Sequence, residues 1–161
     1  MDAFLAIASK RDVRQYAETP VPDEVRQRIL DAGRLSGSGQ NRQDWEFVAV
    51  ETARDELAQA VFAPHNVATA QFVVAIVGRA RPFDAGRAAQ NMMLAAWNDG
   101  VASCPNGVAD ADAAARICGG DVRTIISFGY PATPRDPTTR SAGEWSSRAN
   151  RKPLAELVRV V

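Results

Sequence analysis

The stretch from Asp84 to Asn98 constrains the fold most, because it carries the longest helical pattern in the chain. Alanines and methionines recur along it at helical spacing, and apolar residues occupy much of the helix circumference. We expect Asp84 to cap its first turn and Gly100 to follow its end. Such a helix is buried either in the middle of a structure or in a subunit interface. Gln90 and Asn91 would then need hydrogen-bond partners.

Three segments are predicted to be strands. Gln71 to Val77 is a nearly continuous apolar run, which indicates a strand buried on both faces. Trp45 to Val50 alternates and is rich in strand-forming residues, and Arg123 to Phe128 completes the set. By composition, Ser103 to Gly107 is predicted to be a turn.

Shorter helical patterns surround these strands. Thr52 to Asp55 resembles a capping box for a helix that ends near Ala60, and Asp110 is placed to cap an alanine-rich helix. The other patterns lie at residues 2–9, from Pro22 to about Gly33, from Pro64 and from Pro153. Residues 131–144 have no periodicity and are expected to form an irregular arm. Residues 1–161 are therefore predicted to be a single domain.

The segment from Gly37 to Trp45 is rich in glycine and carboxamide side chains and lies between a helical pattern and a predicted strand. Its composition predicts a loop. Two interpretations remain open from these residues alone. The loop is either a solvated connection or a binding segment, because amides and free backbone N–H groups suit a flat ligand with carbonyls and ring nitrogens.

Two clusters of basic residues stand near the chain ends, Lys10, Arg11 and Arg14 in one and Arg148, Arg151 and Lys152 in the other. Acidic and basic residues balance at 19 each, so no global field attracts nucleic acid or an anionic membrane. Any anion binding must come from such local clusters. The first cluster, beside Asp12, is also open to interpretation as a solvated turn.

Several kinds of site are excluded by the motifs that the chain lacks. The only histidine is His65, and Cys104 and Cys118 have neither zinc-ligand nor redox spacing, so no metal site is expected. A dinucleotide fingerprint, a phosphate loop and a serine nucleophile elbow are all missing. With no evident catalytic side chain, an organic cofactor is expected to carry the chemistry. No membrane span or signal peptide is recognised, and reduced thiols are expected in the cytoplasm.

Five motifs in order resemble those of the nitroreductase family of FMN-dependent enzymes, and together they span nearly the whole chain. They are Arg11-Asp12-Val13-Arg14, Ser38-Gly39-Gln40-Asn41-Arg42-Gln43-Asp44-Trp45, Asp84 to Trp97, Gly129-Tyr130-Pro131 and Arg151-Lys152-Pro153-Leu154. The resemblance implies an α+β fold with a mostly antiparallel central sheet flanked by helices. It also implies an intertwined homodimer with two FMN sites at its interface.

The resemblance further implies which residues bind the cofactor. Arg11 and Arg151, with Lys152 beside them, match the bases that hold the FMN phosphate, and charge-assisted contacts to phosphate are strong. Arg14 matches a residue near the flavin or ribityl chain, where a cation would stabilise the anionic reduced flavin. Ser38, Gly39 and Asn41 would reach the cofactor from the partner subunit, with Gln43 supporting their loop. Pro105, Asn106 and Gly107 match a turn that passes the flavin N5 edge.

The chain departs from the family pattern at three positions. Asp12 stands where a serine is usual, and we expect it to turn toward Arg11 or Arg14, or to bond a ribityl hydroxyl. Flavin-fragmenting enzymes of cobalamin biosynthesis in the same family also read Arg-Asp-Val-Arg, so Asp12 does not forbid FMN. Gly37 and Asp44 replace prolines, which predicts a more mobile loop. The C-terminal arm that embraces the partner is expected to be short.

The resemblance implies an oxidoreductase in which NAD(P)H reduces FMN and the flavin passes hydride to a small acceptor such as a nitroaromatic or quinone, with ping-pong kinetics. Two alternatives remain. One is a flavin-fragmenting enzyme of the same fold. The other is a non-catalytic flavin-binding protein with a degenerate site, suggested by Asp12 and the missing loop prolines.

Overall fold

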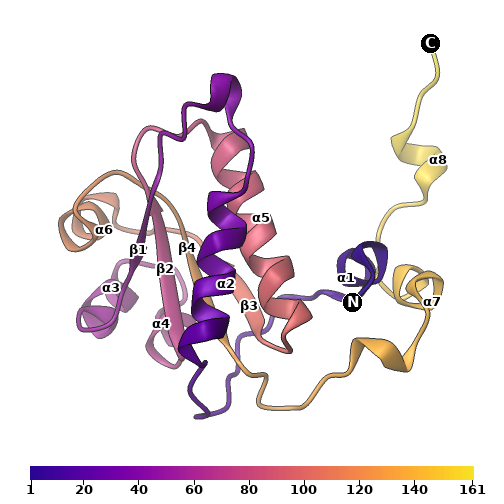
Figure 1. Ribbon diagram of the computed structural model, residues 1–161, viewed down its shortest axis with the longest axis horizontal. Helices are drawn as coiled ribbons and strands as arrows, with labels where there is room; N and C mark the ends of the chain where they lie inside the picture. Colours follow the sequence, from indigo (N-terminus) through magenta and orange to yellow (C-terminus); the bar gives the residue numbers. More distant parts are fainter.

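A four-stranded sheet forms the centre of the computed structural model, which describes residues 1–161 (Figure 1). Its strands are β1 (Glu46–Ala49), β2 (Phe72–Val77), β3 (Ala102–Asn106) and β4 (Val122–Gly129). They lie in the order β1-β2-β4-β3, and every neighbouring pair is antiparallel. The predicted α+β class with an antiparallel sheet flanked by helices is confirmed.

Helices cover both faces of this sheet. α2 (Asp23–Arg34) and α5 (Pro82–Asn98) pack on one face and enclose a hydrophobic cluster that includes Ile29, Met92 and Phe128. α3 (Arg54–Gln59), α4 (Pro64–Ala68) and α6 (Ala111–Cys118) enclose a second cluster on the other face. Successive residues of β2 belong alternately to the two clusters, so every residue of that strand is buried, as its apolar run predicts.

β3 corrects the prediction that Ser103 to Gly107 forms a turn. Ala102 to Asn106 pair with β4 along the whole length of the strand. Proline lacks an N–H donor and is tolerated in a strand only where no partner needs that donor, as at a sheet edge. β3 is such an edge strand, and Pro105 is exposed on it. The pairing with β4 therefore outweighs the turn-like composition of the segment.

Two predicted helix starts are also wrong. α5 begins at Pro82, so Asp84 is not the N-cap but a buried residue of the first turn. Proline at the first helical position suits a helix start, because its φ is preset and its missing N–H would have no helical partner there. The capping box expected from Thr52 does not form, since α3 begins after Ala53 without a side-chain cap. The predicted Asp110 cap on α6 is confirmed by its hydrogen bond from the Ala113 N–H.

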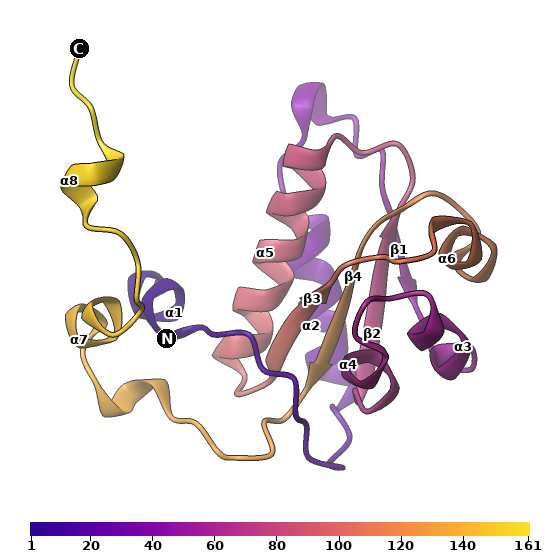
Figure 2. The ribbon, with the colours of Figure 1, turned by 180° about the vertical axis from the view of Figure 1, so that it is seen from behind.

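The first helix and the segment after β4 meet beside the main body. α1 (Ala3–Ser9) lies next to α7 (Ala142–Ser147), which follows an irregular arm with one 3-10 turn, η2 (Pro137–Thr139) (Figure 2). Beyond α7 the chain extends away from the body through α8 (Leu154–Leu157), where Leu154, Leu157 and Val160 are exposed (Figure 1). None of the helices has the length and apolar character needed to cross a membrane.

Candidate functional site

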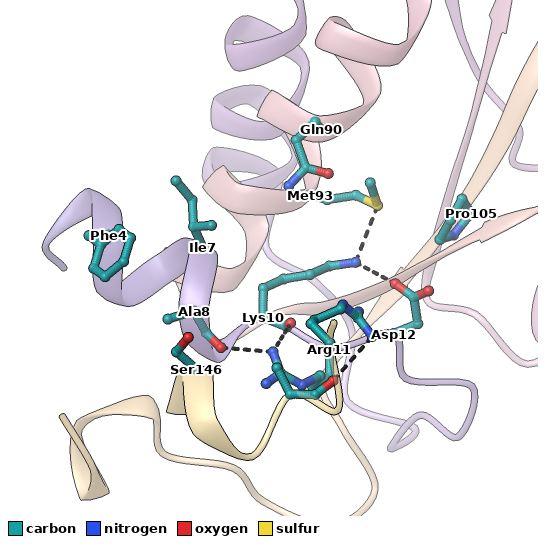
Figure 3. A pocket seen from close by; sticks show the side chains of 12 residues that line it. Phe4, Ile7, Ala8, Lys10, Arg11, Asp12, Gln90, Met93, Pro105 and Ser146 are labelled. Carbon is teal, nitrogen blue, oxygen red and sulfur yellow. Dashed lines mark hydrogen bonds and ion pairs between the residues drawn. The ribbon is translucent and has the colours of Figure 1, made fainter. Parts of the chain in front are cut away.

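A cavity of about 490 Å³ lies where α1, α5, β3 and the C-terminal segment meet (Figure 3). Its size is in the range of small-molecule sites. One part of its wall is apolar and includes Phe4, Ile7, Met93 and Pro105; the polar part is formed by Lys10, Arg11, Asp12, Gln90, Ser146 and Arg151. Four residues predicted to bind the cofactor thus line one cavity, although they are distant in sequence: Arg11, Asp12, Pro105 and Arg151.

Backbone pairing brings the first basic cluster to this place. After α1 ends at Ser9, the chain runs alongside β3, where the Val13 N–H donates to the Ser103 carbonyl at 3.1 Å. Asp12 and Ser103 form a parallel bridge at the edge of the sheet. The segment after α1 therefore forms the floor of the cavity between α5 and the C-terminal segment.

Lys10 is the residue of this site that the sequence predictions missed. Its side chain is only 10% exposed, and its Nζ lies 2.5 Å from Asp12 Oδ1 and 3.4 Å from Met93 Sδ (Figure 3). The expectation that Asp12 turns toward Arg11 or Arg14 is therefore wrong, because its carboxylate is paired with Lys10. The sequence shows a dense basic cluster here, but it does not indicate which of the basic side chains points into the cavity.

Arg11 connects the end of α1 with α7. Its Nη1 donates to the carbonyls of Ala8 and Lys10, both at 2.8 Å, and its Nη2 donates to the carbonyl of Trp145 at 3.1 Å. The guanidinium thus ties the end of α1 to α7 while its positive charge stays at the cavity wall. Arg151 is exposed and donates to the Ala149 carbonyl at 3.1 Å.

The loop predicted to bind a ligand does not line this cavity. It contains η1 (Gly39–Asn41) and lies at the N-terminal end of α5, away from α1 and α7 (Figure 1). Gln40, Asn41 and Gln43 have φ values of 56°, 53° and 54°, a left-handed conformation that is uncommon for residues other than glycine. Such strain persists only where the surroundings hold it, and it clusters at functional sites.

Specific contacts hold that loop. The Gln43 N–H donates to Ser38 Oγ at 2.9 Å, and the Gln43 side chain donates to the Asn41 carbonyl at 3.2 Å. The Gly39 N–H donates to the carboxylate of Asp84 at 3.2 Å. Asp84 is thus buried at the start of α5 because it fixes the loop, not because it caps the helix.

The other predicted site residues also lie outside the cavity lining. Arg14 and Lys152 are exposed. The Asn106 side chain points into the sheet, where its Nδ2 donates to the Cys104 carbonyl at 3.0 Å and to Ser127 Oγ at 3.2 Å. Gly107 accepts a hydrogen bond from the Phe62 N–H at 3.1 Å. The Asn106 Oδ1 is buried and has no hydrogen-bond partner in the chain.

Burial dominates the electrostatics of this region. It raises the pKa of the Cys104 thiol above its usual value, while the positive charge of Arg14 acts in the opposite direction. Burial also raises the pKa of Tyr16, whose hydroxyl bonds Ser127 Oγ at 2.9 Å. Both groups stay protonated at neutral pH and contribute no charge. The charge of the site therefore comes from Lys10, Asp12 and the arginines.

A second cavity of about 440 Å³ continues from the first along the flank of α5. The two cavities share Met93 and Pro105. The remaining lining residues belong to the first half of α5 and to the start of β4: Pro82, Ala85, Gly86, Ala89, Val122, Arg123 and Thr124. Together the cavities form a trough between α5 and the edge strand β3.

The structure offers no alternative metal centre. No group of three or more His, Cys, Asp or Glu side chains is placed to hold an ion. His65 is exposed in α4, and Cys104 and Cys118 are free thiols buried in different places.

Comparison with known proteins agrees with this architecture. The model of the nitroreductase family matches residues 7–81 and 78–130. A candidate NADH dehydrogenase/NAD(P)H nitroreductase of Methanothermobacter thermautotrophicus is 36% identical over 50 residues, which cover 31% of this chain and 26% of that protein. An NADH dehydrogenase of Thermus thermophilus is 31% identical over 78 residues, or 47% of this chain and 38% of that protein. The matched stretches thus span well under half of either relative.

Among solved structures, a candidate nitroreductase of Desulfovibrio desulfuricans in complex with FMN superimposes with a TM-score of 0.81. The two chains are 26% identical, and the match covers 98% of this chain and 96% of the other. The similarity therefore extends over the entire fold, including α1, the sheet and the C-terminal segment.

Proposed function

Because the chain belongs to the nitroreductase family, we propose that it is an FMN-dependent oxidoreductase that uses NAD(P)H as its electron donor. Its acceptor is a small oxidised molecule of the nitroaromatic or quinone class. Donor and acceptor occupy the same open face in turn, which gives ping-pong kinetics. Residues 1–161 act as one FMN-binding domain. The cytoplasmic location stays a prediction from the use of cysteine.

The gathering of cations from both chain ends at one cavity carries this proposal. Lys10 and Arg11 follow α1, whereas Arg151 follows α7, and all three line the same wall. A phosphate is the group that such a wall favours, because guanidinium and ammonium groups donate charge-assisted hydrogen bonds to its oxygens. Lys152, next to Arg151, adds to the positive charge at this end.

The rest of the trough suits the remaining parts of FMN. Gln90 supplies a carboxamide that can bond ribityl hydroxyls, and Met93 and Pro105 form an apolar surface for a ring system. Arg14, Asn106 and Gly107 lie on the same edge of the sheet but outside the lining of the first cavity, and their cofactor contacts stay predictions.

When bound, FMN supplies the two-electron hydride chemistry that no side chain here can perform. The residues of the chain bind FMN and orient it. The bases hold the phosphate end, and the apolar part of the trough excludes water from the reacting face. No side chain in the lining is required as a general acid, because solvent can protonate the product.

A homodimer completes the proposed site. α5 leaves a stripe exposed, formed by Phe83, Arg87, Gln90 and Asn91, and Phe83 is 75% exposed. In a dimer, this stripe would pack against the partner and bring Ser38, Gly39, Asn41 and Gln43 to the partner's cofactor. The strained conformation of the loop and its separation from the cavity of its own chain support this arrangement. The exposed apolar residues of α8 provide further surface for the partner.

The Lys10–Asp12 pair bears on the degenerate-site alternative. One of the two motives for that alternative is a carboxylate close to a phosphate. Because Lys10 pairs with Asp12, the charge of that carboxylate is compensated, which argues against this motive but leaves the missing loop prolines at Gly37 and Asp44 unaddressed.

The test is an absorbance spectrum of the purified protein loaded with FMN, recorded before and after anaerobic addition of NADH or NADPH. We expect a flavin band that bleaches with the nucleotide and returns when a quinone is added. Protein that cannot be loaded with FMN, or whose flavin stays oxidised with both nucleotides, contradicts the proposal. Loss of flavin with oxygen in proportion to turnover would instead identify a flavin-fragmenting enzyme.

A further inference from the structure

Arg123 stands out in the second cavity because it is the only charged residue in the lining. The other wall residues are apolar or uncharged and come from α5, β3 and the start of β4. Arg123 is itself exposed, so its guanidinium is a solvent-accessible positive charge at the rim of a mostly apolar cavity. Such a site favours a ligand with an apolar body and a negative group.

A β-bulge determines where Arg123 points. Along β2 and β4, Ile76 pairs with Thr124, but the next residue, Val77, pairs with Val122. Arg123 is therefore the extra residue with no partner on β2. Bulges re-aim a side chain and are common beside active sites. The irregularity takes Arg123 out of the alternation of β4 and leaves it at the cavity.

Arg123 is also held in place with its outer nitrogens free. Its Nε donates to the Gly78 carbonyl at 2.7 Å. Gly78 has a φ of 107°, and a Cβ at that position would lie 2.9 Å from the Asp44 carbonyl, so only glycine fits there. Neither Nη1 nor Nη2 of Arg123 has a hydrogen-bond or ion-pair partner in the chain. The guanidinium can therefore offer both to an anion.

The position along the trough separates this cation from the phosphate-binding bases. Lys10, Arg11 and Arg151 line the first cavity, whereas Arg123 lines the second, and the two cavities meet at Met93 and Pro105. A ligand that places its phosphate against the first group leaves Arg123 for another molecule beside it. This step rests on the proposed function, in which a second substrate is reduced next to the cofactor.

We propose that Arg123 is a specificity-determining residue that binds a negatively charged oxygen group on the substrate in the second cavity. The preferred substrate of this class is an aromatic acid, such as a nitroaromatic or quinone with a carboxylate. The 2′-phosphate of NADPH carries the same chemistry and is the other source of such a group. Arg123 positions the substrate and takes no part in the transfer of electrons.

The experiment compares Arg123→Gln with wild type on two nitroaromatic acceptors, 4-nitrobenzoate, which carries a carboxylate, and its uncharged methyl ester; each variant is compared with wild type on the same acceptor. Arg116→Gln is the matched control, because Arg116 is exposed on α6 and lines neither cavity. We expect Arg123→Gln to lower kcat/KM for 4-nitrobenzoate by about tenfold, the effect of one charge-assisted contact of about 1.4 kcal/mol. The value for the ester should stay within about twofold of wild type, and Arg116→Gln should change neither value.

Binding is measured separately by equilibrium dialysis of each acceptor with the FMN-loaded protein. The same selective loss for 4-nitrobenzoate is expected, about tenfold in Kd. A loss confined to NADPH, with NADH and both acceptors unchanged, would assign the anionic group to the nucleotide. Equal losses for acid and ester, or no loss for any anionic substrate, would overturn the proposal.

These results are distinguishable from failure of the proposed function. If the wild-type protein reduces neither acceptor with NADH or NADPH, the oxidoreductase assignment fails, while the dialysis still reports whether Arg123 selects the anion. If the wild type reduces the ester and Arg123→Gln shows no preference change, the enzyme assignment stands and the role of Arg123 is rejected.

Discussion

Lys10 and Asp12 form an ion pair in the wall of the first cavity, with 2.5 Å between Nζ and Oδ1. The Lys10 side chain is largely buried, whereas that of Asp12 is 41% exposed. Lys10 also contacts Met93 Sδ on α5, so one side chain connects the segment after α1 with the central helix. Its ammonium group compensates the charge of the Asp12 carboxylate.

This ion pair predicts that Asp12→Ser partly reverses the loss of FMN affinity that Lys10→Ala causes. Lys10→Ala removes one cation and leaves the Asp12 carboxylate unpaired near the phosphate, so we expect FMN to bind about 10- to 100-fold more weakly. Asp12→Ser removes the carboxylate and frees the Lys10 ammonium group, so this variant should bind FMN at least as tightly as wild type. In Lys10→Ala/Asp12→Ser, part of the affinity should return. Fluorescence titration of apoprotein with FMN measures all four constants, and a double variant as weak as Lys10→Ala contradicts the pairing argument.

Arg151→Ala tests the cation from the C-terminal segment. We expect roughly tenfold weaker FMN binding with little change in stability, because its guanidinium makes only one exposed contact, to the Ala149 carbonyl.

Arg11→Ala should weaken FMN binding and also lower the midpoint of thermal unfolding, since Arg11 ties α1 to α7 through three carbonyls. Arg116→Ala is the control for both. Wild-type FMN affinity in Arg11→Ala and Arg151→Ala would exclude these bases as phosphate ligands.

The sheet and α5 could be predicted because their signals are local. An unbroken apolar run such as Gln71 to Val77 requires burial on both faces, and the alanine-rich pattern after Asp84 permits only a helix. β3 could not be predicted this way. Pro105 and Asn106 are turn residues by composition, and they are extended only because β4 lies beside them to pair with the strand. Such non-local pairing leaves no periodicity in the segment itself.

For the site, the sequence identified the basic clusters but not the orientation of each base. Lys10 and Arg11 line the cavity and Arg14 does not, and this depends on where α1 ends and on the packing of α7, which supplies the Trp145 carbonyl to Arg11. No sequence pattern indicated that Arg123 lines a cavity, because its position depends on a bulge between β2 and β4. Register irregularities of this kind are set by the whole sheet and cannot be read from a single strand.

Ser9 and Trp97 provide a test of how α1 is anchored. The indole N–H of Trp97 donates to Ser9 Oγ at 2.9 Å, and both residues are buried. Ser9→Ala leaves that N–H without a partner, which should lower the free energy of unfolding by about 1–3 kcal/mol. In the Trp97→Phe background, where no indole N–H is left unpaired, Ser9→Ala should cost less than it does in wild type. Urea unfolding monitored by circular dichroism measures each value, and a neutral Ser9→Ala would show that the bond contributes nothing.

Cys118 predicts how stability changes in alkaline solution. Burial in α6 raises the pKa of its thiol above the usual value of 9.0. Above that pH the unfolded chain loses the thiol proton while the folded chain keeps it, so ionisation favours unfolding. The stability contributed by the protonated thiol is complete below the unfolded pKa and is lost as pH rises toward the folded pKa.

The corresponding measurement is the free energy of urea unfolding between about pH 8 and pH 10.5. For wild type, one such thiol adds a downward slope of at most about 1.4 kcal/mol per pH unit. Cys118→Ala lacks this contribution, so its stability should fall less steeply over the same interval. All other titrating groups are shared by the two proteins, and identical slopes would show that Cys118 ionises equally in both states.

The proposed exchange of the Ser38–Gln43 loop between subunits predicts complementation in mixed dimers. Asn41→Ala and Arg151→Ala each damage every site of their own homodimer, one through the loop and the other through the phosphate wall. In a mixed dimer, the subunit with intact Arg151 receives the intact loop of its partner, so one of the two sites is fully restored. If the loop instead served the cavity of its own chain, each site would retain one defect.

FMN stoichiometry and NAD(P)H oxidation after co-expression with two affinity tags distinguish these arrangements. Recovery to about half of the wild-type value supports exchange, whereas activity no higher than that of the two parents rules it out.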